Sequence, residues 1–289
     1  MSSNNLLEKV KQLREITGVG FKDCKSAIDE TGGNIEKSVE LLRKKGISKA
    51  NKRMERVAAE GLVCVYEQDN KFSMIEINSE TDFVAKNNDF INFAEEVSKL
   101  VLIKNGKMED VLLSEMKNKR KVKDNLIDLI SKIGEKITLR RSAFIGTNNS
   151  INFSYIHSSI KKNVGKLGVL LSLDTTKSKS EILEIGKQLA MHVAASSPLA
   201  IDEKALDLSV LEKEKEIINE QLKNSGKDSK IVDKIAAGKL NKFISENTLL
   251  DQEWIMEPKK KVKDVLKEAA DKGKIEVIKF VRFKVGEGI

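Results

Sequence analysis

The spacing of apolar residues changes at Gly61, and this change restricts the possible folds more than any other feature of the sequence. Before Gly61, apolar residues recur every three or four positions, which is typical of amphipathic helices. After it, Leu62 to Tyr66 and Phe72 to Ile77 are two β-prone runs separated by the turn residues Gln68-Asp69-Asn70, and this pattern predicts a β-hairpin. The chain is therefore expected to combine helices with antiparallel strands.

Residues 1 to 56 predict a small module of three short helices. The first helix is expected to end at Thr17-Gly18-Val19-Gly20, because glycine adopts backbone angles that a helix does not allow. Asn34 is expected to cap the third helix and Gly46 to end it in a left-handed conformation, with a connector over 49–60. The apolar residues of this segment form only a thin core, so the module should need to dock on the rest of the chain.

The segments 57–149 and 150–289 share one order of elements: a pair of strands, a polar turn and a helix. In the second segment the strands are expected over 151–156 and 167–173, joined by a long lysine-rich turn. The repeated order predicts a core of two subdomains, each with a small antiparallel sheet and packed helices.

Residues from about 203 to 248 follow a purely helical pattern that is broken at Asn224-Ser225-Gly226. This predicts two antiparallel helices that project from the core as a helical hairpin. A last helix after Pro258 and a strand over 275–285 complete the chain. The predicted fold class is α+β, with an N-terminal three-helix module, a two-subdomain core and a projecting helical hairpin.

Composition excludes several kinds of site. The two cysteines form no CxxC pair and His157 and His192 are the only histidines, so neither a zinc site nor a disulfide framework is expected. Every Gly-Lys pair lacks the glycine five residues earlier that a phosphate-binding loop requires. No cofactor, bound metal or enzymatic activity is expected. Because no apolar run approaches the ~18 residues that span a bilayer, no membrane contact is expected and the predicted location is cytoplasmic.

The run from Ser79 to Lys86 places Phe83 and Val84 between charged residues, in a segment that should be a surface turn. Such an apolar pair either folds back into the core or contacts a partner. Periodicity alone favours the core.

Four separated segments occur in one order along the chain: REITGVGFKDCKSAI, TDFVAK, MHVAAS and the closing FVRFKVGEGI. Together they resemble the elongation factor Ts family, the guanine-nucleotide exchange factors of bacterial and organellar elongation factor Tu. The resemblance implies a ubiquitin-associated-like N-terminal module, a two-subdomain α+β core and an antiparallel coiled-coil hairpin. It also implies elongation factor Tu, bound to GDP or free of nucleotide, as the partner.

The resemblance implies a role for the turn formed by Thr81, Asp82, Phe83 and Val84. In the family this turn enters the GTPase beside its nucleotide and displaces Mg²⁺, the largest local positive charge that holds GDP. Asp82 is then expected to act at the metal and Phe83 as a wedge, while Thr81 and Val84 hold the shape of the turn.

The resemblance also implies two further contacts with the GTPase. His157 is expected to make one of them, although a polar residue on a half-exposed strand is an equally good interpretation. His192 is instead predicted to lie in the core, and Cys24 is predicted to be a small buried hydrophobic residue. Lys22 stands where the family commonly has a methionine. The N-terminal contact is expected to involve Arg14, Thr17, Gly18, Val19, Gly20 and Phe21.

An alternative function is that of a basic RNA-binding accessory protein of translation. The net charge of +8 and the basic runs 117–123 and 259–263 would support it, although such runs are usually solvated surface. Aromatic residues, at 4%, are too few for base-stacking platforms, so direct nucleic-acid binding is not expected. The helical hairpin could mediate self-association or contact a second partner domain.

Overall fold

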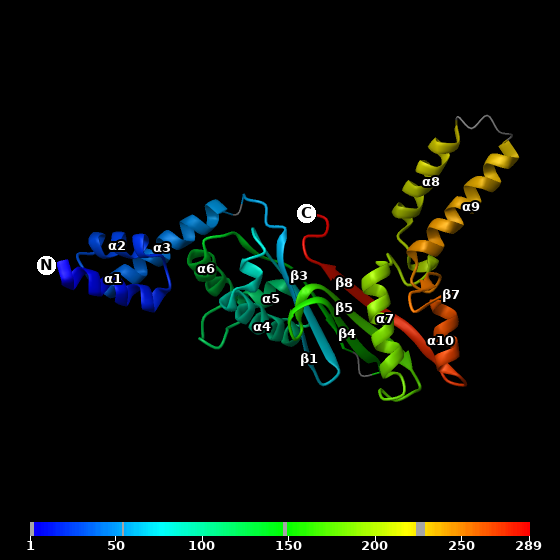
Figure 1. Ribbon diagram of the computed structural model, residues 1–289, viewed down its shortest axis with the longest axis horizontal. Coiled ribbons are helices and arrows are strands. Elements are labelled where there is room, and N and C mark those ends of the chain that lie inside the picture. The colour runs from blue at the N-terminus through cyan, green and yellow to red at the C-terminus, as the bar shows by residue number, and fades with distance from the viewer. Residues whose placement is uncertain (1–2, 54, 147–148, 224–228) are drawn as a thin grey trace.

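A computed structural model describes residues 3–53, 55–146, 149–223 and 229–289. Figure 1 shows helices at the N-terminal end, a sheet with packed helices in the middle, and a helical hairpin that projects from the other end. The sheet is antiparallel, so the predicted α+β class is confirmed. Every helix among the described residues is too short or too polar to cross a lipid bilayer.

The N-terminal module is built from α1 (Ser3–Thr17), α2 (Phe21–Glu30) and α3 (Ile35–Arg53). Its small core is made by buried apolar side chains of all three helices, namely Val10, Leu13, Cys24, Ala27, Ile28 and Leu42. The burial of Cys24 confirms its predicted place as a small core residue.

The third helix does not end at Gly46, so the predicted C-cap and the beginning of the predicted connector are wrong. A Cβ at Gly46 would lie 2.4 Å from Ser131 Oγ of α6 (Val122–Ile133). The glycine therefore allows a close approach of two helices rather than a change of backbone direction. Beyond it, α3 continues to Arg53, whose Nη1 donates to the carbonyl oxygen of Ile130 at 3.0 Å, and this contact docks the module on the core.

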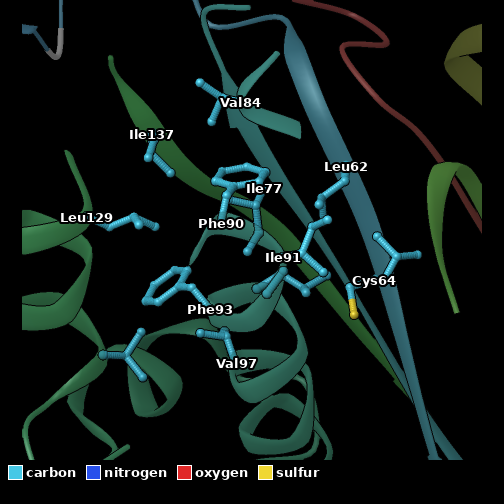
Figure 2. Packing of buried hydrophobic residues seen from close by; sticks show 14 of the residues in the cluster. Leu62, Cys64, Ile77, Val84, Phe90, Ile91, Phe93, Val97, Leu129 and Ile137 are labelled. Atoms are coloured by element: carbon cyan, nitrogen blue, oxygen red, sulfur yellow. The ribbon is translucent and has the colours of Figure 1, made fainter. Parts of the chain in front are cut away.

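The predicted hairpin is present as β1 (Glu60–Gln68) and β2 (Lys71–Ser79), with Leu62 opposite Ile77. β3 (Ile137–Ile145) pairs with β2 on its other side. One face of these strands packs against α4 (Asn88–Ile103), and Figure 2 shows Phe90, Phe93 and Val97 of that helix within the cluster. The remaining elements around this cluster are η1 (Val84–Lys86), α5 (Met108–Leu113) and α6.

The second half has the same kinds of element. Its long strands β4 (Ile151–Lys161) and β5 (Val164–Thr175) extend further than expected, so only Lys162 and Asn163 separate them and the predicted long turn is wrong. Asn163 accommodates this tight connection with a φ of 63°. The other elements are α7 (Leu183–Ser196), η2 (Glu203–Ala205), β6 (Glu253–Trp254), β7 (Glu257–Lys261), α10 (Val262–Ala270) and β8 (Ile275–Lys284).

A short pairing joins the two halves into one sheet of order β3-β2-β1-β5-β4, with β8 also on β5. β1 contacts β5 through two residue pairs, one of them Val63 with Gly165. A cluster that includes Val63, Met74, Leu170 and Phe283 lies between the halves and covers the face of the hairpin opposite α4. Both faces of β1 and β2 are therefore buried. The division into subdomains at residues 57 and 150 stays a prediction.

The projecting hairpin consists of α8 (Leu208–Lys223) and α9 (Ser229–Asn247), which lie side by side in Figure 1. The predicted break at Asn224-Ser225-Gly226 lies outside the described residues. At the base of the hairpin, His192 is buried, as predicted, and its Nε2 donates to Gln252 Oε1 at 3.0 Å. Burial lowers the pKa of His192, so the ring stays neutral at its stacked position against Trp254.

A buried carboxylate, Glu76 of β2, joins three parts of the chain. Its Oε1 accepts from Arg140 Nη1 at 2.9 Å and from the Gly286 N–H at 2.9 Å, and its Oε2 accepts from Arg141 Nε at 2.6 Å. Consecutive strand residues normally point to opposite faces, but the β2–β3 register shifts at Glu76/Ile77 and brings both arginines to one carboxylate. Burial alone would raise the pKa of Glu76, and these donors together hold it below its usual value.

Replacing Glu76 by glutamine should destabilise the fold by about 3 kcal/mol, because the two guanidinium groups would face a neutral amide inside the protein. Urea unfolding of the wild type and Glu76→Gln measures this loss. Glu287→Gln is the matched control, since Glu287 pairs with Arg282 and Arg141 at an exposed rim, and it should cost less than about 1 kcal/mol. Equal losses in the two variants would contradict a special role for the buried carboxylate.

Candidate functional site

The segment between β2 and α4 makes a short, tightly bonded connection. The N–H of Lys86 donates to the carbonyl oxygen of Phe83 at 3.1 Å, and that of Asn87 donates to Val84 at 2.9 Å. The Asn87 side chain then caps α4 by accepting from the N–H groups of Asp89 and Phe90. The chain thus enters α4 through a fixed single turn rather than a loose loop.

Phe83 and Val84 point into opposite environments. The Phe83 side chain is 77% exposed, whereas Val84 is only 6% exposed and belongs to the cluster of α4 and the hairpin. Figure 2 shows Val84 at the upper end of this cluster, above Phe90 and Ile77. The interpretation from periodicity, burial of the pair, is right for Val84 and wrong for Phe83. An exposed phenylalanine on a fixed turn is available to a partner.

Asp82 lies beside Phe83 on the solvent side of the turn. Its carboxylate is 3.7 Å from Lys86 Nζ, and both side chains are at least half exposed. Such an exposed pair contributes little to stability, so the carboxylate can exchange Lys86 for another positive group.

Thr81 is held by a residue that the sequence analysis missed. Its N–H donates to Glu135 Oε2 at 2.9 Å and its Oγ1 donates to Glu135 Oε1 at 2.7 Å. The carbonyl oxygen of Thr81 accepts from Ser79 Oγ at 2.9 Å. Glu135 follows the left-handed Gly134 that ends α6, and it lies 54 positions along the chain from Thr81, so no local pattern could have revealed the contact.

Glu80, the residue before Thr81, accepts a hydrogen bond from the residue after Glu135. The N–H of Lys136 donates to Glu80 Oε1 at 2.6 Å, and Arg56 Nη1 lies 3.2 Å from Glu80 Oε2. The bond from the Lys136 N–H is the main reason why the pKa of Glu80 lies below its usual value, and Arg56 lowers it further. Lys136 Nζ in turn donates to the Arg56 carbonyl oxygen at 2.7 Å. The connector that follows α3 is thus tied to the turn.

The N-terminal candidates lie around the turn between α1 and α2. Gly18 has a φ of 66°, as its predicted helix-ending role requires, and Gly20 is the residue before α2. Thr17 Oγ1 donates to the Leu13 carbonyl oxygen at 2.7 Å and accepts from the Val19 N–H at 3.3 Å. These bonds hold the turn.

Some side chains beside this N-terminal turn are open to solvent, whereas Thr17 is half-buried and Val19, also half-buried, packs against the core of the module. Arg14 is exposed, and Phe21 is 43% exposed. Ile16, also exposed, is an apolar neighbour that the sequence analysis did not single out. An exposed set of this kind can contact a partner.

His157 is an exposed residue of β4, with Nδ1 3.1 Å from the Tyr155 hydroxyl. Two strands, β1 and β5, separate β4 from β2 in the sheet order. The recorded side-chain contact of His157 is with Tyr155 of the same strand, and no recorded hydrogen bond or ring contact among the described residues joins it to the Thr81–Val84 turn. Any joint action of the two requires a partner large enough to reach both.

Comparison with known proteins identifies the family. The family model described as elongation factor TS matches residues 80–287, which include the turn, the helical hairpin and the part of the core that follows β2. The chain belongs to the elongation factor Ts family. It is 41% identical over 284 residues to elongation factor Ts of Bartonella tribocorum and 43% identical over 283 residues to that of a Methylobacterium species (strain 4-46), each match covering 97% of this chain and 92% of the relative. The resemblance based on four motifs is thereby confirmed, and the chain is a translation elongation factor.

The two basic runs of this elongation factor Ts family member differ in their recorded ion pairs. In 259–263, Lys260 pairs with Glu257 and Glu268, and Lys261 and Lys263 both pair with Asp251, whereas in 117–123 the ion pair recorded among the described residues is that of Arg120 with Asp128. The lysines of 259–263 are thus neutralised by neighbouring carboxylates, as is typical of solvated surface, and that run does not favour the RNA-binding alternative. Within the described part of the chain, no three histidine, cysteine or acidic side chains are arranged to hold a metal ion.

The low pKa of Glu80 predicts a pH dependence of this elongation factor's turn. Because the pKa is lower in the folded than in the unfolded chain, the stabilisation is complete above the ordinary carboxyl pKa and is lost as the pH falls through the lowered value. Carbon-13 NMR of the Glu80 carboxyl should show this titration, and the Lys136 amide should shift with it. Most of the depression should remain in Arg56→Gln, since the backbone donor is the larger cause. Titration of wild-type Glu80 at an ordinary value would contradict this account.

Proposed function

We propose that the chain is a guanine-nucleotide exchange factor that promotes GDP release from elongation factor Tu, in the cytoplasm. The observation that carries this proposal is the exposure of Phe83 on a turn that is fixed at both ends. Hydrogen bonds from Thr81 to the Glu135 carboxylate fix one end, and burial of Val84 in the core fixes the other. Family membership supports the partner, because exchange on elongation factor Tu is the activity that this family implies.

In the proposed mechanism the turn enters the GTPase beside its nucleotide. Phe83 would wedge between side chains of the partner and Asp82 would act at the metal shell, so that the turn as a whole displaces Mg²⁺. Removing Mg²⁺ removes a positive charge that holds the diphosphate, so GDP binding weakens. Thermodynamic linkage requires that GDP weakens binding of the factor by the same ratio, with about 1.4 kcal/mol for each tenfold change.

Two further contacts are part of the proposal. The exposed side chains of Arg14 and Phe21, presented by the bonded turn from Thr17 to Gly20, would bind the GTPase domain, and His157 would make a separate contact with it. The helical hairpin, α8 and α9, projects from the core, and we expect it to contact another domain of the partner or a second copy of this chain. No catalytic residue is proposed, because the nucleotide and the metal belong to the partner.

Replacing Phe83 by alanine should slow GDP release about tenfold or more, because the wedge is lost. Release of a fluorescent GDP from purified elongation factor Tu measures the rate. The unfolding free energy should change by less than about 0.5 kcal/mol, since Phe83 has almost no core contacts. Ile103→Ala is the matched control: Ile103 is 63% exposed at the far end of α4, and its loss should leave exchange unchanged. Wild-type exchange in Phe83→Ala would refute the wedge.

Raising the free Mg²⁺ concentration should oppose the factor-stimulated release of GDP, because the metal and the turn compete for one place. The rate is followed at a fixed concentration of factor while Mg²⁺ is varied. Sodium chloride at matched ionic strength controls for screening, which should affect an apolar contact little. Complete indifference to Mg²⁺ would argue against displacement of the metal.

A further inference from the structure

The turn that carries Phe83 has one anchor in the core and one outside it. On the C-terminal side, Val84 is buried among residues of α4 and β2. On the N-terminal side, Thr81 is only partly buried, and its position depends on hydrogen bonds. Phe83 lies between the two and is largely exposed, so its neighbours rather than its own burial hold it in place.

Glu135 supplies the polar anchor through both of its oxygens. One oxygen accepts from the backbone of Thr81 and the other from its side chain, at 2.9 Å and 2.7 Å. Bonds to an ionised carboxylate are stronger than those between neutral groups, and two of them together fix orientation as well as position. With Ser79 Oγ on the Thr81 carbonyl, every polar group of Thr81 has a partner.

A reciprocal bond makes the arrangement a brace between two segments. Glu80, beside the turn, accepts a hydrogen bond from the Lys136 N–H, and Glu135, in the loop after α6, accepts one from the Thr81 N–H. Each segment thus caps a backbone group of the other, and neither can move alone. Removing Glu135 leaves the Glu80 bond in place, so the loss should be felt at Thr81 rather than throughout the fold.

We propose that Glu135 is a positioning residue for nucleotide exchange: it acts through Thr81 to hold Phe83 in the orientation that enters the partner. This inference rests on the proposed function of the turn. The physical reason is preorganisation, because a side chain already held in its bound orientation loses less conformational freedom on binding. Without Glu135 the turn would sample several orientations, of which only some could enter the GTPase.

The first test compares variants of Glu135 in the full chain by the rate of fluorescent GDP release from elongation factor Tu. Glu135→Ala should lower the rate about tenfold, whereas Glu135→Gln should stay within about threefold of the wild type. Glutamine can accept from the Thr81 N–H with its oxygen and donate to Thr81 Oγ1 with its amide. Glu109→Ala is the matched control, since Glu109 is an exposed residue in the first turn of α5. A wild-type rate in Glu135→Ala would overturn the proposal.

A second test separates positioning from general stability. If Glu135 acts only through Phe83, then Glu135→Ala should have no further effect on exchange in a Phe83→Ala background. The same tenfold loss in both backgrounds would mean that Glu135 acts elsewhere, and it would overturn the proposal.

A third measurement does not depend on exchange activity. Hydrogen exchange of the Thr81 amide should be faster in Glu135→Ala, and that of the Lys136 amide much less so. If the wild-type factor does not release GDP but hydrogen exchange of the Thr81 amide is still faster in Glu135→Ala, the proposed function is wrong, while the structural contact between Glu135 and Thr81 is confirmed. If Phe83→Ala loses exchange and Glu135→Ala does not, only the positioning role fails.

Discussion

The ion pairs of Glu76 with Arg140 and Arg141 are the interaction on which the rest of the structure depends. A charge inside a protein is tolerated only where donors surround it, and Glu76 has two guanidinium groups and the Gly286 N–H. These donors come from β3 and from the segment after β8, so one carboxylate reinforces the pairing of β3 with β2 and ties the C-terminal segment to β2. Asn78 extends the network from Glu76 to the backbone of Glu60. The end of β2 therefore leaves the sheet in a defined direction.

That defined direction matters because the Thr81–Val84 turn begins two residues after β2 ends at Ser79. Between Ser79 and Asn87 the side chain of Phe83 is left exposed, but residues on both sides of it are held in place. Thr81 is hydrogen-bonded to Glu135, and Val84 is buried in the core. Local rules would place an aromatic side chain inside, and departures from such rules are expected at functional sites. The exposure is stable because the neighbouring residues, rather than Phe83 itself, hold the turn.

The predictable part of this fold is the part that local patterns determine. The hairpin from Leu62 to Ile77, the core positions of Cys24 and His192, and the two arms of the helical hairpin all follow from periodicity over a few residues. Gly46 shows the limit: glycine at the end of an apolar pattern indicates a cap, but here it allows contact with Ser131, which is distant in sequence. The same reason hides Glu135 and the β1–β5 pairing. For Phe83, periodicity favoured the core, and only the resemblance to a family indicated an exposed side chain.

A rigid turn has a thermodynamic advantage for an exchange factor. A ligand shifts the equilibrium of its partner only by its differential affinity for the two states, so the turn must bind the GTPase without nucleotide more tightly than the GTPase with GDP. Any free energy used to order a mobile turn would weaken binding to both states and slow formation of the complex. Bonds within the free protein, such as those of Glu135 to Thr81, remove that loss before the partner arrives. With that loss removed, the turn binds both states more tightly. The difference between the two states, which determines GDP release, then depends on how differently Phe83 and its turn interact with each of them.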